Sequence, residues 1–262
     1  MMNTVKILSL PLLSAIVLIS CKNAEETNSI SAIDPINDIA LAEVETIETT
    51  SDIFLYVTAY SGLTLREYSN LQSEKLAIMP YGTKVKVISV EKNPTMTIGG
   101  IKGGMNHIEF NHKKGFAFNG YLSKFFPPES DITAKGYAED LQLLFPEVVF
   151  TETNGGIASK PTNTEILILP TNQWHEAFYI AQQLFEFPSE FYFPSQKGKD
   201  SQIIKDSKPK RDVWVSELHI TRKDNVLSKI EYIYKTTKGF TSNVSITKEG
   251  EAMKISKTEI VE

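Results

Sequence analysis

Short apolar segments that alternate with polar residues constrain the fold of residues 53–126 more than any other feature. A period of two predicts strands that are buried on one face and wet on the other. Turn-forming residues separate these segments at 80–83 and 111–115. Roughly five short strands in about 70 residues predict a small barrel, which hides its sheet edges by closing. The alternating pairs are Leu63 and Leu65, Val85 and Val87, Ile108 and Phe110, and Phe116 and Phe118.

The same stretch resembles the bacterial SH3-like (SH3b) family. The resemblance implies a non-catalytic barrel that binds a cell-wall peptide or a protein partner. The chain departs from the family pattern where Met105 replaces a tryptophan, and where Phe116 replaces the tryptophan of a Gly-Trp-Val step. The family's usual ligand therefore cannot be assumed. The matching pieces are YVTA at 56–59, GLTLRE at 62–67, PYGTKV at 80–85, IEF at 108–110, GFA at 115–117 and GYL at 120–122.

Ligand grooves in this family lie among aromatic side chains between loops, so the resemblance implies an aromatic site here. Aromatic rings suit binding because they offer a large contact area at little cost in side-chain freedom. The ordinary alternative is that at least half of these rings pack in the core or in turns. The candidates for ligand binding are Tyr60, Tyr68, Tyr81, Phe116 and Tyr121.

Four glycines gather at the end of the long segment 91–105. They predict either a mobile lip or a tight extra hairpin around Thr97 and Ile98. No Gly-Lys-Ser or Gly-Lys-Thr follows them, so they are not a phosphate-binding loop. The glycines are Gly99, Gly100, Gly103 and Gly104.

Two prolines at 127–128 end the first unit, and the pattern then changes. The pattern of residues 131–262 predicts an α+β domain with two helices and an antiparallel meander. Together with the small barrel, this domain makes the predicted fold class of the chain mainly β with α+β. The first helix would place Ala134, Tyr137, Leu141 and Leu144 on one face, with Asp131 or Thr133 as N-cap and Pro146 as its stop. The second would begin near Trp174 and end before Pro188. The predicted strands are 148–150, 166–169, 213–221, 227–236, 242–247 and 253–260.

The first 20 residues are typical of a secretory signal. Lys6 precedes an apolar run of about a dozen residues, which is too short to cross a bilayer as a helix. Leu18, Ile19 and Ser20 lead directly to Cys21, the only cysteine, and this order resembles a bacterial lipobox. The resemblance implies that residues 1–20 are removed and that Cys21 carries the lipid. The alternative is an ordinary secreted protein with a chance cysteine at this position.

The composition of residues 21–52 predicts an extended acidic tether. Eight acidic residues oppose Lys22 in this stretch, which contains no aromatic residue. The start of the stretch, Lys-Asn-Ala-Glu-Glu, is similar to an export signal of surface lipoproteins. We therefore expect a chain anchored by lipid in the cell envelope, at the outer membrane, facing the periplasm or the cell surface. The net charge of −5 argues against a nucleic-acid partner.

The sequence offers little for catalysis, and it predicts no metal and no cofactor. His107 and His112 flank Glu109 without an apparent third ligand. His175 and Glu176 begin like a zinc-protease helix, but the required second histidine is replaced by Tyr179. A cysteine peptidase would need a free thiol, and none remains once Cys21 is acylated.

Two segments of the second half could contact a partner. One is the aromatic stretch 185–194, for which core packing is the competing interpretation. The other is the lysine-rich stretch 197–211, which is either a solvated loop or a surface for an anionic polymer.

The sequence as a whole predicts a lipid-anchored, non-enzymatic envelope protein whose SH3-like domain binds a wall peptide or an envelope protein. One alternative is a hydrolase that uses carboxylates, alone or with His175, in the second half. Another is a structural subunit of an envelope complex. The expected division is a signal peptide at 1–20, a tether at 21–52, a barrel at 53–126 and an α+β domain at 131–262.

Overall fold

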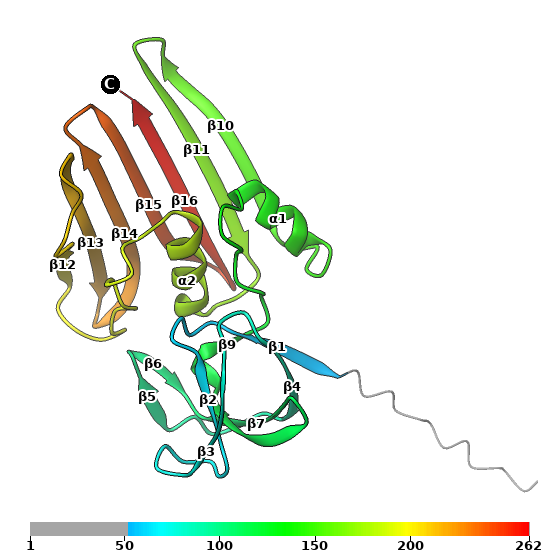
Figure 1. The fold of residues 1–262 in the computed structure, drawn as a ribbon. Helices are drawn as coiled ribbons and strands as arrows, with labels where there is room; N and C mark the ends of the chain where they lie inside the picture. Colours follow the sequence, from blue (N-terminus) through cyan, green and yellow to red (C-terminus); the bar gives the residue numbers. More distant parts are fainter. Residues whose placement is uncertain (1–51, 262) are drawn as a thin grey trace, which may run out of the picture. The chain divides into compact units, whose positions relative to one another are not determined.

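Two antiparallel seven-stranded sheets, a two-stranded sheet and two α-helices make up the structure, a computed structural model that describes residues 52–261 (Figure 1). These residues belong to one compact unit. The predicted signal peptide, Cys21 and the predicted tether up to residue 51 lie outside the described residues. The mainly β fold class is confirmed.

The first sheet has the strand order β3-β2-β8-β7-β4-β1-β9. Its alternating residues bury Leu63, Leu65, Val85 and Ile108 on one face, as predicted. The strands are β1 (Ile53–Val57), β2 (Leu63–Arg66), β3 (Lys75–Met79), β4 (Lys84–Ser89), β7 (Met105–Phe110), β8 (Lys113–Phe118) and β9 (Leu122–Ser123), with a 3-10 turn at Asn119–Tyr121 before the last.

The prediction of a closed barrel is not met. Within residues 52–261 no backbone pairing joins β3 to β9, so these two strands remain the edges of an open sheet. The last strand has only two residues, and both pair with β1. A strand this short leaves little edge exposed, which is one way in which open sheets avoid pairing with other chains.

Strand β8 departs from the predicted alternation at Phe116, although Phe118 is buried as expected. Gly115 and Ala117 face the core, and Phe116 points to the other side, where its ring stacks on His107 at 4.8 Å between centroids. The reason is steric: a Cβ atom on Gly115 would lie 2.5 Å from the backbone oxygen of Arg66. The sheet therefore folds too tightly at this point for a large inward residue.

The glycine-rich segment forms the hairpin that the sequence offered as one of two outcomes. Strands β5 (Met96–Ile98) and β6 (Ile101–Gly103) pair with each other, and Gly99 and Gly100 form the turn with φ of 57° and 78°. Positive φ at both central residues is the requirement of the tightest hairpin turn, and glycine meets it without strain.

The second sheet has the strand order β10-β11-β16-β15-β14-β13-β12. Its last four strands in sequence form the predicted meander. Two features were not predicted: β10 and β11 extend well beyond the short strands expected, and the lysine-rich stretch contains an edge strand. The strands are β10 (Val149–Ile157), β11 (Lys160–Leu169), β12 (Ser201–Lys205), β13 (Val213–Lys223), β14 (Val226–Thr236), β15 (Phe240–Glu249) and β16 (Ala252–Val261).

Both predicted helices are present and pack on this sheet. Helix α1 (Ala134–Gln142) contacts β10 and β11, and α2 (Trp174–Leu184) contacts β15 and β16. The Thr133 hydroxyl caps α1 by accepting the Gly136 N–H. The placement of Leu144 was wrong, because α1 ends at Gln142 and leaves Leu144 exposed. Neither of these two described helices has the length and apolar content to cross a bilayer.

Candidate binding cleft

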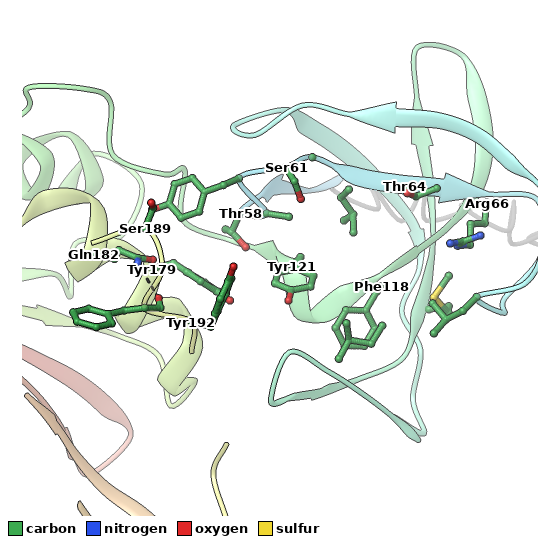
Figure 2. Close-up of a pocket in the computed structure, with 18 residues that line it drawn as sticks. Thr58, Ser61, Thr64, Arg66, Phe118, Tyr121, Tyr179, Gln182, Ser189 and Tyr192 are labelled. Carbon is green, nitrogen blue, oxygen red and sulfur yellow. Dashed lines mark hydrogen bonds between the residues drawn. The ribbon is translucent and has the colours of Figure 1, made fainter. Parts of the chain in front are cut away.

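A cleft of about 520 Å³ lies where elements of the first sheet meet helix α2 and the segment that follows it (Figure 2). Aromatic rings form much of its wall. Three stretches of chain contribute them: the turn after β1, the end of β8 with the following 3-10 turn, and residues 179–192. The aromatic lining residues are Tyr60, Phe118, Tyr121, Tyr179, Phe191 and Tyr192.

Local sequence explains why these rings are held at the rim. Gly62 ends the turn after β1 with φ of 82°, and this sharp turn presents Tyr60 and Ser61. The tip of the β5–β6 hairpin fits closely against Tyr121, because a Cβ atom on Gly99 would lie 2.5 Å from the Tyr121 hydroxyl. Ile98 of that hairpin also lines the cleft. The glycine turn therefore shapes one side of the site.

The tyrosines pack against one another. Tyr60 stacks on Tyr81 with ring centroids 4.9 Å apart, and Tyr179 lies 6.4 Å from Tyr60 and 6.2 Å from Tyr121. Burial raises the pKa of both Tyr60 and Tyr179. These phenols are therefore neutral at physiological pH, and they offer a large apolar contact area with hydroxyl donors.

The five candidates from the sequence do not form one site. Tyr60 and Tyr121 line the cleft, and Tyr81 supports it from behind by stacking on Tyr60. Tyr68 is 60% exposed and does not line it. Phe116 is occupied by its contact with His107.

Sequence reasoning named the stretch 185–194 as a possible contact surface, but it did not predict that the second half would share a cleft with Tyr60 and Tyr121. Tyr179 comes from α2, and Phe191 and Tyr192 come from the aromatic stretch 185–194. That stretch is mainly core, since Phe187, Phe191 and Phe193 are buried, but Tyr192 is 78% exposed. The density of aromatic residues there was a usable signal, although it could not show which of the rings would face out.

Two polar side chains provide specific contacts in the cleft. Arg66 is the only charged residue among the described lining residues. It is half-buried, and its Nη1 donates to the Ser73 carbonyl at 2.8 Å. Gln182 is buried on α2 and uses its Nε2 to donate to the carbonyls of Pro188 and Phe191, each at 3.0 Å. These bonds hold residues 188–191 against the helix.

Helix α2 is tied to the first sheet by a buried carboxylate. The Ser123 hydroxyl donates to Glu176 Oε1 at 2.6 Å, and the Thr171 hydroxyl donates to Oε2. The Tyr60 hydroxyl also donates to Gln183 Oε1 at 3.2 Å. The two walls of the cleft are thus held together by the bonds of Glu176, which lie outside the cleft, and by the bond of Tyr60, which lines it.

His175 does not lie in this cleft. Its side chain is buried at the start of α2, its Nδ1 has no hydrogen-bond partner, and burial lowers its pKa to about 4. A histidine without access to solvent cannot exchange protons with a substrate, so the position of His175 gives no support to a hydrolytic site built on it.

A second cleft of about 620 Å³ lies on the second sheet and is lined by both charges and rings, including Tyr234 and Phe240. Asp206 is fixed there by the Ser216 hydroxyl at 2.9 Å and by the Lys208 N–H at 2.7 Å. Burial raises the pKa of Asp206, but hydrogen bonds with Lys208, Ser216 and Glu190 together outweigh that effect, and the net pKa is lowered. An ionised carboxylate held in this way can bind a donor group.

Within residues 52–261 no cluster of three or more histidine, cysteine or acidic residues could hold a metal ion. Comparison with known proteins found no match for the chain among protein-family models, curated proteins or solved structures.

Proposed function

We propose that this protein is a lipid-anchored, non-catalytic component of the cell envelope that binds a wall peptide or a protein partner through the aromatic cleft. The observation that carries the proposal is that six aromatic residues line one cleft, and that four of them, Tyr60, Tyr121, Tyr179 and Tyr192, are at least partly exposed there. Concave sites with apolar walls and a few convergent polar groups are the usual form of binding sites for small ligands.

The proposed fold of the first sheet agrees with this role. We regard residues 53–126 as an SH3-like module that is left open at β3 and β9, joined to an α+β domain at 131–262. In this arrangement the second half supplies part of the binding surface, through Tyr179 and Tyr192. Its contribution would give this protein a ligand preference different from that of a lone SH3-like module.

Replacing Tyr192 by alanine should weaken retention on purified peptidoglycan or on the captured envelope partner by roughly tenfold, since an aromatic anchor in an interface contributes about 1–2 kcal/mol or more. The side chain is 78% exposed, so the substitution should leave the stability nearly unchanged. Binding of the full chain in detergent would be measured by sedimentation with peptidoglycan and by pull-down from envelope extracts.

Tyr68→Ala is the matched control, because Tyr68 is also exposed but lies outside the cleft. Equal loss of binding in the two variants would contradict the assignment of the cleft. If neither peptidoglycan nor the envelope extracts retained the unmodified chain, the proposed function itself would be contradicted.

Replacing Cys21 by serine should move the protein from the membrane fraction to the soluble fraction. A serine hydroxyl cannot take the thioether-linked lipid, and without acyl chains the anchor is lost, since each buried CH₂ contributes about 0.8 kcal/mol. Fractionation of cells and labelling with a radioactive or clickable fatty acid would measure the change. An unchanged distribution together with unchanged labelling would refute the anchor.

A further inference from the structure

We propose that the cleft recognises a short peptide by its free terminal carboxylate, which Arg66 binds. This inference rests on the proposed function, since it names the chemical group that the binding site selects. It depends on three observations: a guanidinium without an anionic partner, an amide oxygen on a lining residue that accepts no bond from the described protein, and aromatic rings between the two.

Arg66 has unused hydrogen-bonding capacity. A guanidinium carries five N–H donors, and the structure records one bond from Arg66, to the Ser73 carbonyl. No described carboxylate lies within ion-pair distance of it, and no other charged residue lines the cleft. A half-buried cation without a counter-charge favours an anionic ligand, because the ligand then supplies the missing partner.

Gln182 provides the complementary group. Its Nε2 is occupied by the carbonyls of Pro188 and Phe191, and these bonds fix the orientation of the amide. Its Oε1 accepts no hydrogen bond from a described residue, and Gln182 is one of the residues that line the cleft. A fixed acceptor of this kind suits a backbone N–H of a ligand.

Figure 2 shows Gln182 and Arg66 on opposite sides of Tyr121 and Phe118. A ligand that spans the cleft would therefore meet an acceptor at one end, aromatic rings in the middle and a cation at the other end. A peptide fits this order, with a backbone N–H near Gln182, an apolar side chain on the rings and its terminal carboxylate on Arg66.

A carboxylate fits the site better than a phosphate does. A phosphate brings up to two negative charges and three strong acceptor oxygens, and it is usually met by several cations. Here a single guanidinium is available, and the neighbouring lining residues are apolar or hydroxylated. A monoanion with two coplanar oxygens matches the remaining fork of one guanidinium.

The test compares two forms of one defined probe on the full chain in detergent: acetyl-Ala-Phe-Leu-Ala with a free carboxyl terminus, and the same peptide as its C-terminal amide. We expect calorimetry to give at least tenfold tighter binding of the acid. Arg66→Gln should remove this preference, so that both forms bind with the weaker affinity. Arg211→Gln, an exposed arginine outside the cleft, should keep the preference.

Equal affinity of the unmodified chain for acid and amide would overturn the carboxylate inference and leave peptide binding intact. Binding of neither peptide would also overturn it, and retention by peptidoglycan or an envelope partner would then decide whether the proposed function falls as well. If inorganic phosphate displaced the bound acid peptide as effectively as more of the same peptide does, that result would show a general anion site and overturn the inference. Because the acid–amide comparison uses the unmodified chain, it does not depend on the folding of any variant.

Discussion

Lowering the pH from 7 to 4 should reduce the free energy of unfolding by about 3 kcal/mol through His175 alone, because its pKa is about 4 in the folded protein and about 6.5 in the unfolded chain. Between these values the unfolded chain binds a proton on His175 and the folded protein does not. The folded state therefore loses stability as the pH falls through this window and is unaffected by His175 above it.

The physical cause is desolvation without compensation. His175 is 8% exposed, its Nδ1 has no partner, and the ring of Phe193 lies edge-on to it at 6.0 Å. The neighbouring carboxylate of Glu176 is engaged by Ser123 and Thr171 instead. An imidazolium in this place would be a buried charge that lacks a counter-ion.

The measurement is the urea-unfolding free energy as a function of pH for the unmodified chain and for His175→Leu. Other carboxylates also respond to acid, so the relevant quantity is the difference between the two pH profiles. We expect the free energy of unfolding of His175→Leu to fall by about 3 kcal/mol less between pH 7 and pH 4 than that of the unmodified chain. His112→Asn, at an exposed turn position with φ of 61°, is the matched control and should follow the unmodified profile. Parallel profiles for His175→Leu and the unmodified chain would contradict the prediction.

The parts of the fold that could be predicted are those in which one face is buried. Strands β13 to β16 have buried residues at alternate positions over part of their length, and this alternation made their pattern readable. The full length of the hairpin formed by β10 and β11 could not be predicted from the sequence. Almost every residue of β10 is exposed, so its sequence carries no apolar period.

The candidate site was only half predictable for a similar reason. Tyr60 and Tyr121 lie in turns between strands of the first sheet and are among the ligand-binding rings that the sequence analysis expects. Tyr179 and Tyr192 reach the same cleft only because α2 and the segment after it pack against the first sheet. Such long-range packing depends on contacts between distant residues, which a local pattern does not encode. The outward position of Phe116 shows the same limit, because the sequence pattern did not reveal how closely Gly115 approaches the backbone of Arg66.

Replacing Glu176 by leucine should destabilise the protein by about 3 kcal/mol, because two buried hydroxyl donors lose their acceptor and each unsatisfied group costs about 1–3 kcal/mol. The donors are Ser123 on β9 and Thr171 before α2. Glu176→Gln has a side chain of nearly the same shape and keeps one carbonyl oxygen as an acceptor. It should therefore lower the free energy of unfolding clearly less than Glu176→Leu does. Urea unfolding at pH 7 would measure both variants, with Glu139→Leu on the exposed side of α1 as the control.

This carboxylate also links stability to the cleft. It joins β9, which directly follows Tyr121, to α2, which carries Tyr179 and Gln182. If the junction positions the two walls, Glu176→Leu should weaken ligand binding more than Tyr68→Ala does, even at temperatures where both variants are folded. A variant that is destabilised as expected but binds with unchanged affinity would show that the walls are held by their own aromatic contacts, such as that between Tyr60 and Tyr179.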